Sequence, residues 1–144
     1  MKELLKKGYI PIQLKKNRLG HFLIPVKIKN RRFDFILDTG ATATCLDRDL
    51  IYILDFKKSS KKDPQAQGLG GSVAAEIINL SLVSIGEIDI SSINVALIDL
   101  TSVKQACELK KAKTIQGIIG VDLLERCKAV IDWANKTIWL KQTT

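Results

Sequence analysis

The stretch FDFILDTGATATC, residues 33–45, joins a run of strand-forming residues to an aspartate, a threonine and a glycine. Apolar side chains at every second position of its first half predict a strand with one buried face, which ends at Asp38. An aspartate can act as a general acid or base, the Thr39 hydroxyl can donate and accept hydrogen bonds, and Gly40 allows a close backbone approach. The tripeptide is suited to holding one carboxylate in place, although the same residue types also form ordinary turns.

Two further glycine-containing motifs follow along the chain. GLGG (68–71) lies between a polar loop and strand-like sequence, so it predicts the tip of a hairpin. A phosphate-binding loop is disfavoured, because GLGG is not followed by Lys-Ser/Thr and opens no helix. GIIGVDLL (117–124) predicts a short apolar strand that leads into a short amphipathic helix.

Strand patterns dominate the rest of the sequence. The first two strands predict a β-hairpin with its turn at 30–32, and Ser102 and Gln105 have the spacing of a helix capping box. The fold class predicted is all-β with two or three short helices. Strands are expected at 21–29, 33–38, 87–99, 129–133 and 137–140, and helices within 47–55, 101–113 and 121–128.

The positive charge of the chain is concentrated at its N-terminus. Of 144 residues, the first 32 carry ten Lys or Arg against one Glu, whereas the rest is nearly neutral and the whole has a net charge of +8. We interpret residues 1–20 as a basic N-terminal arm and 21–144 as a single domain, since the chain is long enough for one core. The arm has no cluster of aromatic residues for stacking on bases and no nucleic-acid motif, so no nucleic acid is expected, but binding of RNA or an anionic surface stays an alternative.

Several other functions are disfavoured by what the sequence contains. No apolar stretch is long enough to span a membrane, and the N-terminus has no signal-peptide core, so we expect a cytoplasmic protein with no membrane span. The three cysteines have no metal-ligand spacing and are expected to be reduced thiols. His21 is the single histidine, so neither a metal site, a cofactor nor a histidine-based nucleophilic enzyme is expected.

The ordered set of DTGA, GLGG and GIIGVDLL resembles the retropepsin-like aspartic proteases, the single-domain relatives of retroviral proteases. The resemblance covers about residues 21–140. It implies a retropepsin-like closed or partly open β-barrel, the half-domain of acid proteases, with a flap hairpin. One departure is a segment of some 15 extra residues before the Ile-Ile-Gly strand; this and the longer N-terminal arm leave open how the termini take part in a dimer.

The resemblance also implies roles for individual residues. Asp38 would be the catalytic aspartate, Thr39 would tie two active-site loops together through its hydroxyl, Gly40 would let these loops approach, and Ala41 stands where relatives can carry serine. The remaining site residues are the flap tip Gln67, Gly68, Leu69, Gly70 and Gly71, then Ile118 and Ile119 beside the substrate channel, and Gly120 packed under the DTG loop.

Aspartic protease chemistry needs two carboxylates that share one proton, an effect for which this enzyme class is itself the standard example. The chain has one DTG, and neither Asp34 nor Asp132 is followed by residues that can form the same turn. We therefore expect a homodimer in which Asp38 of each copy supplies half of the dyad. The predicted function is an aspartic endopeptidase that acts on extended peptide or protein substrates. The alternative is a catalytically silent dimeric module of the same fold that binds peptides or proteins.

Overall fold

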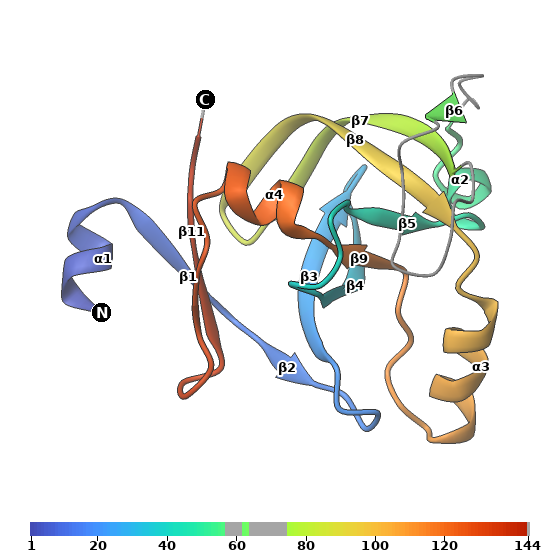
Figure 1. Ribbon diagram of the computed structural model, residues 1–144, viewed down its shortest axis with the longest axis horizontal. Coiled ribbons are helices and arrows are strands. Elements are labelled where there is room, and N and C mark those ends of the chain that lie inside the picture. The colour runs from blue at the N-terminus through green and yellow to red at the C-terminus, as the bar shows by residue number, and fades with distance from the viewer. Residues whose placement is uncertain (57–61, 64–74, 144) are drawn as a thin grey trace.

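The computed structural model describes residues 1–56, 62–63 and 75–143, and it is built mostly from strands (Figure 1). The predicted class, all-β with short helices, is confirmed. In chain order the elements are α1 (Lys2–Lys6), β1 (Tyr9–Gln13), β2 (Lys15–Lys16), β3 (Phe22–Ile28), β4 (Arg31–Leu37), β5 (Cys45–Asp47), α2 (Leu50–Ile53), β6 (Lys62–Asp63), β7 (Ala75–Ile85), β8 (Ile88–Ile98), α3 (Thr101–Leu109), β9 (Gly117–Ile119), α4 (Val121–Arg126), β10 (Val130–Asp132) and β11 (Thr137–Lys141).

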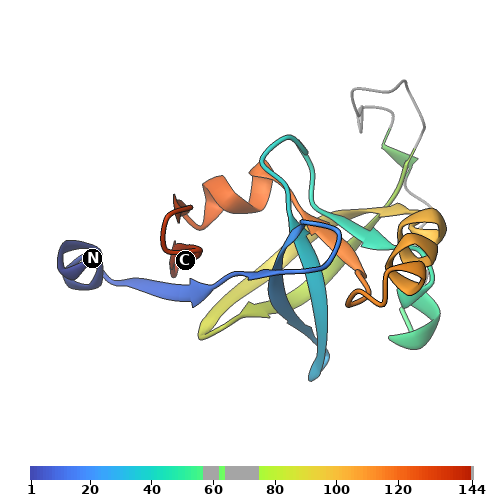
Figure 2. The same ribbon diagram turned by 90° about the horizontal axis from the view of Figure 1, so that it is seen from below.

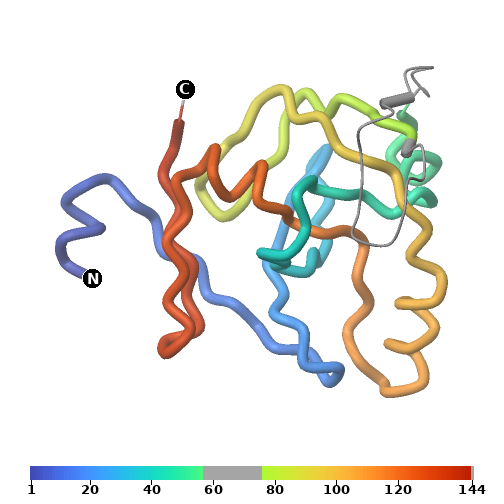
Figure 3. Tube along the Cα trace, viewed as in Figure 1, coloured from blue at the N-terminus to red at the C-terminus, as the bar shows by residue number. Residues whose placement is uncertain are grey.

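The larger sheet closes into a barrel. Its strand order is β2-β3-β4-β9-β5-β8-β7-β6, and an additional pairing between β3 and β7 joins the two sides. The closed ring consists of the six strands β3, β4, β9, β5, β8 and β7. The Cα trace in Figure 3 shows the path of the chain through these strands. Closure leaves few open edges in this part of the molecule.

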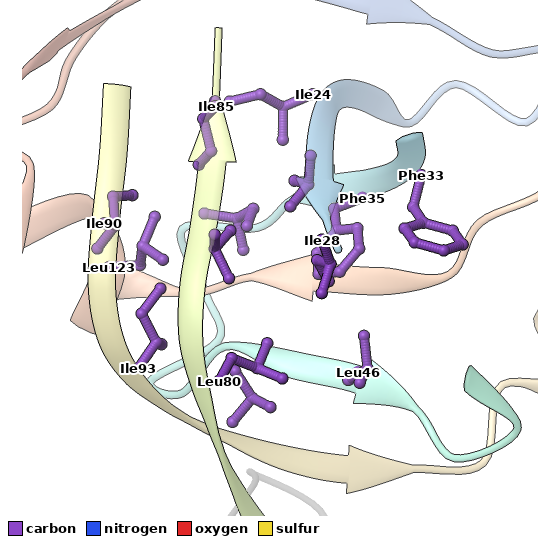
Figure 4. Close-up of a cluster of buried hydrophobic side chains, with 14 of the residues drawn as sticks. Ile24, Ile28, Phe33, Phe35, Leu46, Leu80, Ile85, Ile90, Ile93 and Leu123 are labelled. Atoms are coloured by element: carbon purple, nitrogen blue, oxygen red, sulfur yellow. The ribbon is translucent and has the colours of Figure 1, made fainter. Parts of the chain in front are cut away.

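The β3–β4 hairpin delivers the DTG segment to the end of a central strand. Its turn is at Lys29 and Asn30, both with positive φ, and it begins one residue before the expected turn at 30–32. Phe33 and Phe35 point into the core together with Leu46 of β5, as Figure 4 shows. The alternation seen in the sequence is therefore the alternation of buried and outward side chains along β4.

The second, smaller sheet has the order β1-β11-β10 and lies beside the barrel (Figure 1). Here the structure differs from the basic arm expected for residues 1–20. Ile12 and Leu14 are buried in the main core, and β1 pairs with β11 along five residues. The apolar residues Ile10, Ile12 and Leu14 alternate with exposed residues, so the segment from Tyr9 onward forms a strand of the domain although lysines flank it.

Helix α3 lies in the extra segment before β9, and it has a small core of its own. Cys107 of this helix and Ile115 after it are buried against Leu23. The capping box expected from Ser102 and Gln105 is not formed. Instead, Oδ1 of Asp99 accepts a hydrogen bond from the Thr101 N–H at 2.8 Å.

Within residues 1–56, 62–63 and 75–143, no helix is long and apolar enough to cross a membrane.

Candidate active site

The loop that follows β4 holds Asp38 by one hydrogen bond to its carboxylate and two to its backbone. The Gly40 N–H donates to Asp38 Oδ1 at 2.8 Å, and the Ala41 N–H donates to the Asp38 carbonyl at 3.2 Å. The Asp38 N–H donates in turn to the Ile119 carbonyl at 3.1 Å, which extends the parallel pairing of β4 and β9 by one residue. Asp38 is half-buried, whereas Thr39 and Gly40 are exposed in the single chain. Hydrogen bonds thus fix the backbone of Asp38, while the next two residues of its loop remain accessible to solvent.

Gly120 packs directly against this loop. A Cβ atom at Gly120 would lie 2.6 Å from the carbonyl carbon of Ala43 and 2.9 Å from the carbonyl oxygen of Ala41. The next residue, Val121, donates its N–H to that Ala41 oxygen at 2.8 Å. Since the obstructing atoms belong to the backbone, only glycine allows the start of α4 to approach the loop this closely.

A pair of residues that the sequence analysis did not single out connects the loop to α4. The Thr44 hydroxyl donates to Asp122 Oδ1 at 2.8 Å and accepts a hydrogen bond from the Gly120 N–H at 3.1 Å. The backbone N–H groups of Thr44 and Leu123 also donate to the Asp122 carboxylate. The one hint in the sequence is a polar residue, Asp122, in the first turn of an otherwise apolar segment. Its partner is 78 positions away, so the contact could not be inferred.

The two isoleucines of the GIIG motif lie on opposite faces of β9. Ile118 is half-buried, but Ile119 is only 1% exposed and belongs to the main core. Adjacent residues of a strand point to opposite sides, so the expectation that both line a substrate channel is revised to Ile118 alone. Gly117 lies under the Phe35 ring, where a Cβ would come within 2.3 Å of a ring carbon.

Cys45 lies close to both carboxylates of the site. It is opposite Ile118 in the antiparallel pairing of β5 and β9, and its Sγ donates to the Ala43 carbonyl at 3.4 Å. Burial raises the pKa of the Cys45 thiol to about 11, and the negative charges of Asp122 and Asp38 add to the rise. The thiol is therefore neutral at physiological pH.

The expected flap tip, residues 67–71, lies outside the described residues. The described strands on either side of it, β6 and β7, pair antiparallel with Lys62 opposite Glu76. Among the side chains that the structure describes, no group of three or more histidine, cysteine or acidic residues could hold a metal ion.

The barrel and its glycine-supported Asp-Thr-Gly loop define the class of protein. The sequence profile of a family described as aspartyl protease matches residues 24–123, and the chain belongs to this family. Comparison with curated protein sequences found no match.

Solved structures with a similar fold come from varied sources. A retropepsin-like aspartic protease from Rickettsia conorii has 27% identity and a TM-score of 0.59, with 92% of this chain and 90% of that chain covered. The EIAV protease in complex with the inhibitor HBY-793 has 18% identity and a TM-score of 0.57, with 82% and 98% covered. The retroviral protease-like domain of Ddi1 from Leishmania major has 16% identity and a TM-score of 0.55, with 85% and 90% covered. The fold is therefore retropepsin-like, as expected from the three motifs.

Proposed function

We propose that the protein is a homodimeric aspartic endopeptidase in which Asp38 from each of two copies forms the catalytic dyad. The observation that carries the proposal is the geometry of the loop in a chain of this family. The Asp38 carboxylate accepts the Gly40 N–H at 2.8 Å, while Thr39 and Gly40 beside it are exposed and available to a second copy.

In this proposal the second carboxylate comes from another chain, because two other aspartates of the domain are engaged in contacts of their own. Asp122 accepts hydrogen bonds from two backbone N–H groups and the Thr44 hydroxyl, so its oxygens are already engaged. Asp34 is paired with Lys113 at 2.9 Å. A twofold axis beside Asp38 is the simplest arrangement that supplies an equivalent free carboxylate.

The dyad then divides the chemistry between two identical groups. Two carboxylates about 3 Å apart share one proton, because both cannot be ionised at that distance. The ionised member accepts a proton from a water molecule, which attacks the peptide carbonyl carbon. The protonated member hydrogen-bonds to and polarises the carbonyl oxygen. Collapse of the tetrahedral intermediate breaks the C–N bond, and a proton moves to the leaving amine, with no covalent enzyme intermediate.

The substrate in this proposal is an extended peptide held between the barrel and a flap at Gln67 to Gly71. Main-chain hydrogen bonds would supply affinity, and alternate side chains would enter pockets near Ile118. Ala41 offers no hydroxyl to stabilise the ionised carboxylate, so we expect a less acidic pH optimum than in relatives with serine at this position. The proposed location of the protein is the cytoplasm.

The proposal is tested by comparing the wild-type protein with Asp38→Asn and Asp55→Asn on a diverse peptide library from about pH 3 to about pH 8, with products identified by mass spectrometry. Asp38→Asn should lose activity by on the order of 10³-fold, since it removes the acid and base groups of both copies. Asp55 is exposed and has a positive φ that asparagine also adopts, so Asp55→Asn is the matched control and should keep full activity.

Two results would contradict the proposal. Peptide cleavage that survives Asp38→Asn would remove Asp38 from the chemistry. Peptide binding without cleavage at any pH, in both the wild type and the variant, would favour the silent binding module instead.

A further inference from the structure

The turn of the β3–β4 hairpin lies at the opposite end of strand β4 from the Asp38 loop. Strand β4 runs from Arg31 beside the turn to Leu37, and Asp38 follows directly. Its seven residues span about 20 Å at the usual rise of a strand. Figure 2 shows the hairpin pointing away from the loop that follows β4, which is drawn in cyan. A small ligand bound beside the turn therefore lies well away from the candidate active site.

Positive charge is concentrated beside this turn. The segment KIKNRR (27–32) contains four exposed cations, Lys27, Lys29, Arg31 and Arg32. The Nζ of Lys29 donates to the Leu54 carbonyl at 2.7 Å and lies 4.1 Å from the centre of the Phe56 ring. Among the side chains that the structure describes, the other three cations have no carboxylate within ion-pair distance. They are therefore available to an anion from solution.

Two of these cations, Lys27 and Arg32, form a facing pair across the hairpin. Lys27 of β3 is directly opposite Arg32 of β4 in the antiparallel register. Their neighbours Val26 and Phe33 are buried, so both charged side chains point outward. Cβ atoms of directly opposite residues are about 5 Å apart, and like charges in such positions destabilise a sheet. The facing pair is therefore unfavourable by itself, and an anion between its two groups would remove the repulsion.

The facing pair lines a recess of about 220 Å³, the hairpin recess. Its other lining residues are Pro25, Val26, Ser84 and Gly86. Ser84 belongs to β7 and is opposite Lys27 in the pairing that closes the barrel. Of the described residues, none that lines the recess is acidic. Its volume is below the range of about 300–1,000 Å³ that drug-sized ligands need, so it suits one small anionic group with a few further atoms.

Acidic residues close to the hairpin recess do not neutralise the facing pair. Asp34, on the same outward face of β4, is paired with Lys113 at 2.9 Å. Asp89 of β8 accepts a hydrogen bond from the Ser84 hydroxyl at 2.6 Å. Glu87, in the turn after β7, is exposed and has no ion pair with a described side chain. Since Ser84 donates to Asp89, the facing pair supplies the donors that a ligand in the recess meets.

The donor groups of the facing pair favour phosphate. The guanidinium of Arg32 presents parallel N–H groups that match two oxygens of a phosphate or a carboxylate. The ammonium of Lys27 adds a second positive charge, which favours a doubly charged anion over a singly charged carboxylate. The aromatic rings beside the cations are not open to stacking on bases, because Phe33 is 7% exposed and Lys29 lies over the Phe56 ring. A small phosphate ligand therefore fits this site better than a nucleic-acid strand.

We propose that the hairpin recess binds a phosphate group, either free or carried by a small organic molecule. The Arg32 guanidinium and the Lys27 ammonium contact the phosphate oxygens, and an attached organic part lies against Pro25. Binding removes the repulsion within the facing pair, so it stabilises the folded chain. This site is separate from the proposed peptidase chemistry, since it involves neither Asp38 nor a second copy.

Isothermal titration calorimetry at neutral pH and low salt tests the proposal with inorganic phosphate and glycerol phosphate, each compared with acetate at equal ionic strength. The wild type should bind at least one phosphate probe about tenfold more tightly than acetate, and the tighter of the two probes identifies the free or the organic form. Lys27→Gln/Arg32→Gln should weaken that binding by at least about tenfold. Lys15→Gln/Arg18→Gln removes the same two charges from exposed positions outside the recess, so it is the matched control and should keep the wild-type Kd within about threefold.

Urea unfolding shows whether the double variant folds, and it tests the repulsion within the facing pair. Without ligand, Lys27→Gln/Arg32→Gln should have a higher urea midpoint than the wild type, because the like charges are gone. The phosphate probe that binds should raise the midpoint of the wild type and of Lys15→Gln/Arg18→Gln. It should leave the midpoint of Lys27→Gln/Arg32→Gln unchanged.

Three results would overturn the proposal. If the wild type binds neither phosphate probe more tightly than acetate, the hairpin recess is not a phosphate site. If both double variants lose binding equally, the net positive charge of the chain attracts the anion and the recess does not. If neither double variant changes the Kd, phosphate binds elsewhere on the protein.

Discussion

The Thr44 hydroxyl and the Asp122 carboxylate are joined by a 2.8 Å hydrogen bond that links the Asp38 loop to helix α4. Thr44 is only 2% exposed, and its hydroxyl also accepts the Gly120 N–H at 3.1 Å. Together these contacts hold the loop and the helix in one arrangement. The pair therefore holds the loop of the candidate active site in position.

Replacing Thr44 by valine should destabilise the protein by about 1–3 kcal/mol, because the Gly120 N–H and a carboxylate oxygen lose a buried partner while the side-chain volume is kept. Peptide cleavage, if present, should fall further than the loss of folded protein explains. Thr42→Val is the matched control, since Thr42 is exposed and should change the free energy of unfolding little. Urea unfolding followed by circular dichroism gives both values. Equal free energies of unfolding and equal cleavage activities for Thr44→Val and Thr42→Val would contradict a positioning role for Thr44.

Features of the site that depend on local sequence patterns could be predicted, whereas contacts between residues far apart in the sequence could not. Asp38 and Gly40 could be predicted because strand alternation and turn chemistry are local. The pairing of Thr44 with Asp122 joins residues 78 positions apart, and no local signal reports such a distance. The sequence indicates a basic arm at residues 1–20 because lysines flank the apolar residues Ile12 and Leu14, whose burial becomes evident only when β11 lies beside this segment.

Gly117, at the start of β9, and Gly120, just after its end, should differ in how the cost of an alanine substitution can be relieved. Gly117→Ala places a Cβ against the Phe35 ring, and Gly120→Ala places one against the backbone of Ala43. Both should destabilise the protein, with overpacking costs of typically 1–3 kcal/mol. A second substitution, Phe35→Leu, should relieve the overpacking of Gly117→Ala, because the smaller side chain makes room for the new Cβ. It should not relieve Gly120→Ala, whose Cβ meets backbone atoms.

A double-mutant cycle measured by urea unfolding checks this expectation. The free energy of unfolding of Gly117→Ala/Phe35→Leu should be higher than the sum of the two single losses predicts. Gly120→Ala combined with Phe35→Leu serves as the control, and it should show additive losses. Additivity in both cycles would contradict the contact between Gly117 and the ring.

Lys104 of α3 neutralises a buried carboxylate of β5. Its Nζ lies 2.7 Å from Asp47 Oδ2 and 2.9 Å from Asp49 Oδ2, and the Asp47 side chain is only 4% exposed. Lys104→Met should destabilise the protein by about 3 kcal/mol, because Asp47 would keep a buried charge without its partner. Lys110→Met, at an exposed residue just after the helix, is the matched control and should be nearly neutral.

The same pair predicts a loss of stability in strong alkali. Hydrogen bonds to Asp47 and Asp49 raise the pKa of Lys104 above its ordinary value of 10.5. The stabilisation is therefore complete below pH 10.5 and is lost as the pH rises through the folded-state pKa. Unfolding midpoints of the wild type and Lys104→Met should converge as the pH rises through this range. A constant difference between them would show that the ion pair is not what stabilises the helix.

Cys45 offers a chemical probe of the charge at the candidate active site. Its pKa of about 11 results first from burial and then from the charges of Asp122 and Asp38. Only the thiolate is alkylated, so iodoacetamide should label Cys45 slowly at neutral pH and faster as the pH approaches 11. Asp38→Asn removes one of the two charges that raise the pKa. It should therefore shift the labelling profile of Cys45 to lower pH, as read by mass spectrometry of the peptide that contains it.

The buried Cys127 is the internal control, because the causes that raise its pKa include burial but not Asp38. Its labelling profile should be the same in the wild type and in Asp38→Asn.

The raised pKa of Cys45 also makes the free energy of unfolding depend on pH. The folded-state pKa of Cys45 exceeds the ordinary 9.0, so unfolded chains lose this proton first, and the free energy of unfolding should decline between about pH 9 and about pH 11. Cys45→Ser should remove part of that decline, and an unchanged decline would mean that the thiol is not held in its neutral form by the fold.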